Sequence, residues 1–178
     1  MSALRRFTPQ PDGILLGRFE PIEADLLRLA TTQLLEMLRS GTTDPQLTAS
    51  DGAFGRLLPD AYRDDDEAAA EFRRFTATGL LERKAQNAQI VLDSLAASEP
   101  DTATPDREDS QPVTVSVDPD AVQAWLRSLT DLRLTLADRL QISPDGIVHL
   151  ATEDTPFLRE LYEWLGMLQE ELVYAIDV

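Results

Sequence analysis

The chain of 178 residues lacks cysteine altogether and contains a single histidine, His149. Without cysteine it can form no disulfide, thiolate metal site, iron–sulfur cluster or thiol nucleophile. One histidine is too few for a multi-histidine zinc centre. Aromatic residues make up only 6% of the chain, so leucine and alanine must fill the core. The sequence gives no reason to expect a metal or any other cofactor.

Long hydrophobic runs are also missing. No unbroken apolar stretch approaches the roughly 20 residues that a membrane-spanning helix requires, and residues 1–17 lack the apolar core of a signal peptide. Apolar residues nevertheless amount to 43% of the chain, which is typical of a globular protein. We therefore expect a cytoplasmic protein with no membrane partner.

Positive charge is scarce, because 16 basic residues face 32 acidic ones and the net charge is −16. Affinity for nucleic acids depends on lysine and arginine neutralising phosphates, so direct DNA binding is not expected and a basic protein partner is favoured. Basic residues gather near the N-terminus and in residues 73–84. We expect them to pair with the surplus carboxylates, and DNA contact is the alternative. The residues concerned are Arg5, Arg6, Arg73, Arg74, Arg83 and Lys84.

The spacing of apolar residues predicts a mainly α-helical bundle of four or five helices with a small N-terminal β-hairpin element. The hairpin is expected over residues 4–19, because Pro11-Asp12-Gly13 is a turn tripeptide and prolines confine its first strand to a sheet edge. Residues 113–117 alternate with period two and are expected to pair with this hairpin. Helices are expected from Pro21 to a stop at Gly41, from a start near residues 64–67 to a break or bend at 76–79, and over residues 81–95, 119–140 and 155–176.

Residues 98–112 contain three prolines and no large apolar side chain. This composition predicts a solvated, mobile acidic loop. Neither half of the chain alone offers enough apolar residues for a good core. We therefore expect a single domain over residues 1–178, with the loop as an insertion.

An acidic cluster precedes the helix expected from residue 64. Carboxylates at a helix start complement the positive end of the helix dipole, and this is the interpretation we favour. The alternative is a Mg²⁺ or Ca²⁺ site, but the spacing lacks the alternating ligands and central glycine of a calcium loop. The cluster consists of Asp60, Asp64, Asp65, Asp66 and Glu67.

No catalytic constellation is evident. His149 has no serine or cysteine motif beside it, and the sequence contains no nucleophile elbow, phosphate loop or dinucleotide fingerprint. We therefore expect no enzymatic activity and name no catalytic residue. Trp125 and Trp164 fall on or beside the apolar stripes of the last two helices and are expected in the core, with an interface as the alternative.

Three segments carry a family resemblance, namely residues 56–76, 124–140 and 162–173, together with the opening RRF…GILLGRFEPIEADLL. The chain resembles the actinobacterial oxidative-stress regulator (AosR) family, formerly catalogued as a domain of unknown function. The resemblance implies a cytoplasmic transcriptional regulator that senses oxidation. In the family this sensing is attributed to a pair of cysteines near the N-terminus, and regulation to joint action with an alternative sigma factor on cysteine-biosynthesis genes.

This sequence departs from that pattern at the sensing cysteines. Residues 4–9 read LRRFTP, so a thiol–disulfide switch is chemically excluded. Met1, Met37 and Met167 can be oxidised, but none has the sequence context of a sensor. We expect a transcriptional regulator that acts through a protein partner such as a sigma factor or RNA polymerase. The alternative is a non-catalytic adaptor or scaffold. The apolar stripe of residues 22–38 and the two tryptophan-bearing helices also offer surface for a homodimer.

Overall fold

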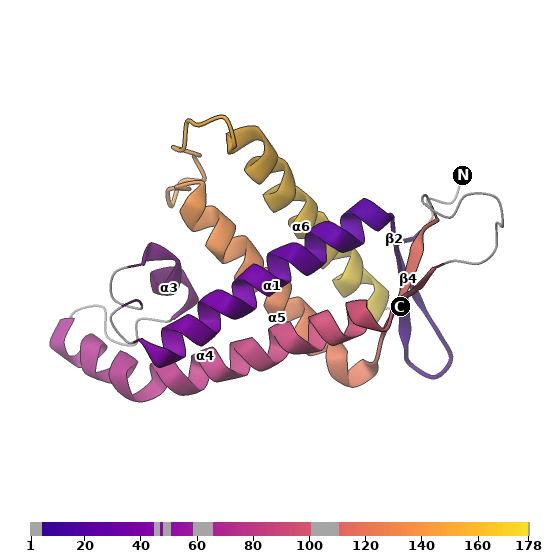
Figure 1. Ribbon diagram of the computed structural model, residues 1–178, viewed down its shortest axis with the longest axis horizontal. Helices are drawn as coiled ribbons and strands as arrows, with labels where there is room; N and C mark the ends of the chain where they lie inside the picture. The colour runs from indigo at the N-terminus through magenta and orange to yellow at the C-terminus, as the bar shows by residue number, and fades with distance from the viewer. Residues whose placement is uncertain (1–4, 45–46, 48–50, 59–65, 101–110, 178) are drawn as a thin grey trace.

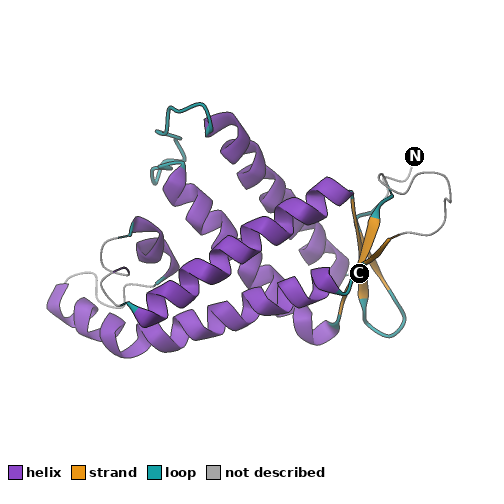
Figure 2. Ribbon diagram, viewed as in Figure 1, coloured by secondary structure: helices purple, strands orange, loops and turns teal. Residues whose placement is uncertain are grey.

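The computed structural model describes residues 5–44, 47, 51–58, 66–100 and 111–177. It consists of long helices with a small sheet at one end (Figures 1 and 2). The helices are α1 (Pro21–Thr43), α3 (Gly52–Leu57), α4 (Asp66–Ala96), α5 (Pro119–Arg139) and α6 (Thr155–Ile176). The strands are β1 (Phe7–Pro9), β2 (Leu15–Phe19), β3 (Glu99–Pro100) and β4 (Val113–Val117).

The predicted mainly α-helical architecture is confirmed. Within the described residues there are five helices and one antiparallel four-stranded sheet with the order β1-β2-β4-β3. Helix α4 lies along α1, and the α5–α6 hairpin crosses behind α1 (Figure 1). No helix in the described part of the chain is long and apolar enough to cross a membrane.

The N-terminal hairpin forms where turn chemistry predicts it. Gly13 adopts a φ of +86°, which glycine accepts without strain, and β1 lies at the sheet edge as its prolines require. Strand β4 pairs with β2 in the register Gly17↔Val115, so the predicted pairing of residues 113–117 with the hairpin is confirmed. The prediction of a loop over 98–112 is wrong at Glu99–Pro100, which pairs with β4, and residues 101–110 lie outside the described part.

Helix α1 begins with a capping box in which the side chains of Glu20 and Glu23 bond to each other's backbone N–H groups. The predicted stop at Gly41 is wrong, because the helix continues to Thr43. Gly41 is buried, and a Cβ atom there would lie 2.7 Å from a ring carbon of Phe54. This glycine therefore brings α1 close to α3 instead of ending the helix.

Helix α4 is continuous through residues 76–79, so of the predicted break or bend the break is wrong. Gly79 is exposed, and a Cβ atom at this position would meet nothing within 4 Å. A glycine within a helix costs about 1 kcal/mol relative to alanine, whereas burial of one leucine contributes roughly 2 kcal/mol. Because Leu81, Val91 and Leu95 are all buried, packing outweighs the local cost of Gly79.

The core joins the sheet to the helices. Trp125 of α5 is fully buried and contacts Phe19 of β2, with ring centroids 6.4 Å apart. Phe7 of β1 packs edge-on against Phe19 at 6.0 Å. The core position predicted for Trp125 is confirmed, while Trp164 is only half-buried and packs at the margin of the core.

Candidate protein-binding surface

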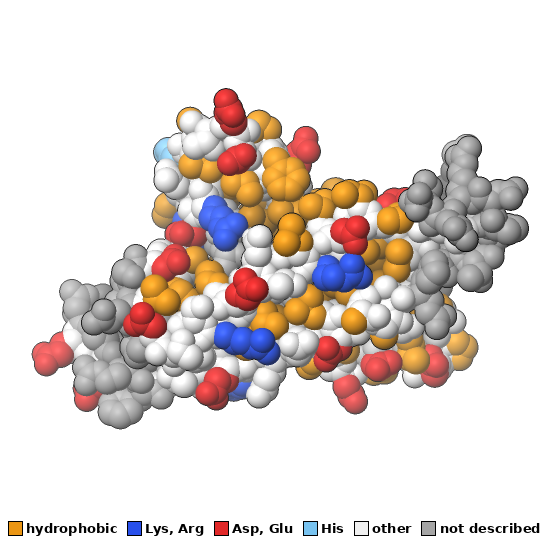
Figure 3. All heavy atoms as spheres, in the orientation of Figure 1, with side chains coloured by type: hydrophobic (Ala, Val, Ile, Leu, Met, Phe, Trp, Pro, Cys, Tyr) orange, Lys and Arg blue, Asp and Glu red, His pale blue; other side chains and the backbone are white. Residues whose placement is uncertain are grey.

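An apolar groove lies where α1 passes over the α5–α6 hairpin. Its volume is 170 Å³, and a second hollow of 190 Å³ extends it along α6 to Trp164. Figure 3 shows hydrophobic side chains gathered between the ridge of α1 and the projecting end of the hairpin. The groove is lined by Leu26, Leu29, Ala30, Gln33, Leu34, Met37, Leu132, Thr135, Leu136, Arg139, Phe157, Leu158 and Leu161.

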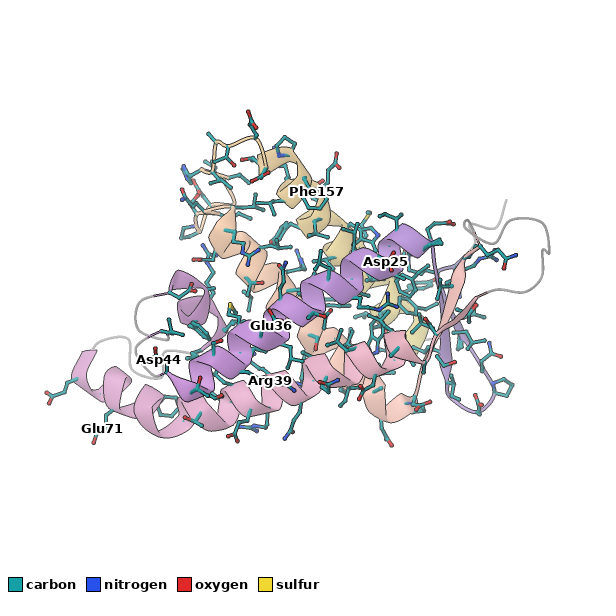
Figure 4. All side chains as sticks on the ribbon, viewed as in Figure 1. Asp25, Glu36, Arg39, Asp44, Glu71 and Phe157 are labelled. Atoms are coloured by element: carbon teal, nitrogen blue, oxygen red, sulfur yellow. The ribbon has the colours of Figure 1, made fainter. Side chains whose placement is uncertain are left out.

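Two large side chains flank the groove and remain open to solvent. Leu29 of α1 is 57% exposed and Phe157 of α6 is 52% exposed. Figure 4 places Phe157 on the same side of the molecule as Asp25 and Glu36 of α1. An apolar groove between helices is the geometry in which proteins receive the apolar face of a partner helix.

The sequence predicted an apolar surface over residues 22–38 but not its limits. Leu27, Leu34 and Leu38 of this stripe are buried in the core, whereas Ile22 and Leu29 are exposed. The signal was the width of the stripe, since a helix with apolar residues on more than one side cannot cover all of them against a single neighbour.

Arg6, in contrast, is fully engaged within the fold. Its guanidinium donates hydrogen bonds to both carboxylate oxygens of Glu23, at 2.7 and 3.1 Å, and to Glu171 at 2.9 Å. It also stacks over the ring of Phe19. Arg6 thus ties the start of the sheet to α1 and α6.

This contact changes the acidity of Glu23. Burial alone would raise the pKa of the Glu23 carboxyl, but the hydrogen bond from Arg6, the backbone N–H of Glu20 and the Arg6 charge together hold that pKa below its ordinary value. Glu23 therefore stays ionised at neutral pH and keeps Arg6 neutralised.

Lys84 is engaged in the same way on the other side of the bundle. Its Nζ lies 2.7 Å from Oδ1 of Asp131, whose side chain is only 2% exposed. Burial raises the pKa of Asp131, and the hydrogen bond and charge of Lys84 act in the opposite direction. The predicted pairing of basic residues with carboxylates is thus confirmed for Arg6 and Lys84. It is wrong for Arg83, which has no carboxylate partner in the described part of the chain.

Comparison with known proteins identifies the family. The model of the family described as "Domain of unknown function (DUF2017)" matches residues 4–176. The chain belongs to the DUF2017 family. No solved structure matches the chain.

The chain is also similar in sequence to mycobacterial proteins named "Oxidative stress regulator AosR". Those of Mycobacterium bovis and Mycobacterium tuberculosis are each 32% identical to this chain over 140 residues, covering 71% of the chain. The chain spans 58% of the length of these relatives. The AosR-like membership predicted from the sequence motifs is confirmed.

The residues around His149 of this DUF2017 chain do not assemble into a catalytic site. His149 is exposed, and its Nε2 lies 3.1 Å from the hydroxyl of Ser143 in a surface turn. That hydroxyl also bonds to Asp145 and lowers the pKa of its carboxyl. Because Asp145 contacts the serine and not the histidine, the three residues do not form the relay of a catalytic triad.

The acidic cluster lies mostly outside the described residues, which begin again at Asp66. Among the residues that the structure does describe, no three acidic or histidine side chains gather as metal ligands would. Asp60, Asp64 and Asp65 are not among them, and neither are the side chains of Arg73 and Arg74. These two arginines occupy positions in α4.

Proposed function

We propose that this protein is a non-catalytic regulator of the response to oxidative stress that acts by binding a protein of the transcription machinery, such as an alternative sigma factor or RNA polymerase. The name of the mycobacterial relatives supports the regulatory role. The absence of cysteine means that a thiol switch takes no part in this member. The oxidation signal therefore reaches it through a partner or another ligand.

The observation that carries this proposal is the apolar groove between α1, α5 and α6. Its open flanks at Leu29 and Phe157 leave apolar area that a bound helix would cover. Glu160 lies on the adjoining hollow and the chain as a whole carries −16. These charges favour an amphipathic helix with basic flanking residues as the occupant.

The proposal is tested with purified proteins and substitutions in the groove. We expect Leu29→Ser and Phe157→Ser each to weaken binding of the cognate sigma factor or polymerase by about tenfold, as loss of an apolar anchor would. The matched control is Ile90→Ser, since Ile90 is an exposed apolar residue of α4 away from the groove. Equal affinity for all four proteins would contradict a role for the groove.

An adaptor or scaffold role is the second candidate, supported by the same groove. Affinity purification from the organism of origin distinguishes the two roles. Recovery of a sigma factor or polymerase supports the regulator, whereas recovery of a protease or biosynthetic enzymes supports the adaptor. Sedimentation of the purified chain tests whether a second copy fills the groove, because the variant Leu29→Ser would then shift a dimer to a monomer.

A further inference from the structure

A separate hollow, of 390 Å³, lies between α4, α5 and the C-terminal half of α6. It shares no lining residue with the apolar groove. Its lining combines basic and amide side chains with apolar ones, and both kinds come from more than one helix. The lining residues are Leu80, Arg83, Lys84, Asn87, Leu126, Arg127, Thr130, Asp131, Gln169 and Val173.

The lining of this hollow is unusually basic for so acidic a chain. Arg83, Lys84 and Arg127 line the hollow, and Asp131 is the one carboxylate among its described lining residues. The local charge is therefore +2, three cations less one anion, in a protein with a net charge of −16. Cations gathered in a concave surface attract anions more strongly than the same charges spread over a convex one.

Two of these cations have no partner among the residues that the structure describes. Arg83 and Arg127 form no hydrogen bond, ion pair or ring contact with any residue in the described part of the chain. Arg83 comes from α4 and Arg127 from α5, so the packing of two helices places both at one hollow. Asp131, by contrast, is buried and holds the ammonium of Lys84 at 2.7 Å, which fixes the third cation in the wall.

The remaining lining restricts the ligand further. Leu80 and Leu126 are half-buried and Val173 is exposed, so the same hollow also offers apolar surface. Arginine side chains bind carboxylates and phosphates in a bidentate manner. The combination fits an anionic head group attached to an apolar body of a few carbon atoms.

We propose that this hollow is a binding site for a small organic anion, in which Arg83 and Arg127 hold a carboxylate or phosphate group and the leucine side chains cover its apolar part. The site is independent of the protein partner proposed above. A nucleic-acid backbone is a poorer occupant, because its repeated phosphates would need a longer basic track and the exposed Glu82 adjoins Arg83 on α4.

The experiment is a calorimetric titration of the full chain with four probes at constant ionic strength. Hexanoate and butyl phosphate carry both parts of the proposed ligand and distinguish a carboxylate head group from a phosphate. Inorganic phosphate lacks the apolar body, and butanol lacks the charge. We expect saturable binding of hexanoate or butyl phosphate, at least about tenfold tighter than that of inorganic phosphate, and none of butanol.

The variant pair Arg83→Gln and Arg127→Gln, combined in one chain, is expected to weaken that binding at least about tenfold. The matched control combines Arg39→Gln with Arg159→Gln, which removes the same charge from exposed arginines that line neither the hollow nor the groove. We expect the control to change the affinity less than about twofold. Circular dichroism checks that both variants keep the fold.

Three results would overturn the proposal. The first is absence of saturable binding for both hexanoate and butyl phosphate. The second is an equal loss of affinity in the two variant pairs, which would indicate a general charge effect. The third is displacement of the bound anion by a short DNA strand at the same ionic strength, which would make the hollow part of a nucleic-acid surface.

Discussion

Removal of Lys84 is expected to destabilise the fold far more than removal of its partner. In the variant Lys84→Met, the Asp131 carboxylate stays buried with no cation, since its Oδ2 already has no hydrogen-bond partner among the described residues. Loss of one member of a buried ion pair costs about 3–5 kcal/mol. Because the Lys84 side chain is 22% exposed, we expect the lower end, about 3 kcal/mol.

The variant Asp131→Asn makes the opposite change. It removes the buried charge and leaves Lys84, whose ammonium can turn toward solvent. We expect the free energy of unfolding to change by no more than about 1 kcal/mol. Urea titration followed by tryptophan fluorescence measures both variants, since the fully buried Trp125 reports the loss of the core. Equal destabilisation by the two substitutions would refute the reasoning.

The same pair predicts a pH dependence with a definite sign. Burial raises the pKa of Asp131 above its ordinary value despite Lys84. The folded state therefore holds this proton more tightly than the unfolded chain does. The resulting stabilisation is complete below the unfolded pKa and is lost as the pH rises through the folded pKa.

In Lys84→Met the pKa of Asp131 is expected to rise further, because the cation that opposes the effect of burial is gone. The stabilisation from the bound proton is therefore lost at a higher pH than in the native chain. The difference in the free energy of unfolding between the native chain and this variant should therefore shrink as the pH falls from about 8 to about 5. Asp131→Asn lacks the titrating group and serves as the control. A loss in the free energy of unfolding of Lys84→Met that stays constant between these two pH values would contradict this explanation.

Three further predictions concern the helices and DNA. Gly79→Ala should raise the free energy of unfolding by about 1 kcal/mol, because a Cβ atom at this position meets nothing within 4 Å. Gly41→Ala should lower it by about 1 kcal/mol, because the added Cβ would lie 2.7 Å from a ring carbon of Phe54. Thermal unfolding of both variants tests the continuity of α4 and the close approach of α1 to α3. Thr31→Val should raise the free energy of unfolding by about 1 kcal/mol, because the Thr31 hydroxyl is buried and has no hydrogen-bond partner among the described residues. A lower free energy of unfolding in a urea titration would contradict this prediction. In mobility-shift titrations at about 0.15 M salt, the purified chain should not bind duplex DNA at sub-micromolar concentration unless a sigma factor or polymerase is added; unassisted binding with a steep salt dependence would contradict it.

Local signals sufficed for the hairpin and for most helix starts. Pro11-Asp12-Gly13 specifies a turn through its own backbone preferences, and the alternation of residues 113–117 indicates a strand without knowledge of its partner. These signals failed at Gly41, where a local rule predicted a helix end, and at Gly79, where it predicted a break or bend and the helix is unbroken. Packing against α3 and α1 decided both positions, and packing between distant segments is not visible in a short window of sequence.

The candidate sites were harder to predict for the same reason. The apolar stripe of α1 was evident, but which of its residues stay uncovered depends on how α1 crosses the α5–α6 hairpin. Arg83 was recognised as basic, yet its neighbour in the hollow is Arg127, which lies on another helix. Sequence reasoning found Arg83 and Lys84 together and could not separate the paired lysine from the free arginine.

The groove and the anion hollow are both built on α5 and α6 but share no lining residue. Substitutions at sites without shared contacts usually have additive effects on free energy. The combination of Leu29→Ser with Arg83→Gln should therefore weaken partner binding as much as Leu29→Ser alone, provided that no anion is present. When hexanoate is present, a change in partner affinity that Arg83→Gln abolishes would measure coupling between the two surfaces through α5 and α6. A further loss of partner affinity caused by Arg83→Gln without the anion would instead indicate that the partner itself contacts the hollow, and the two surfaces would then form one binding site.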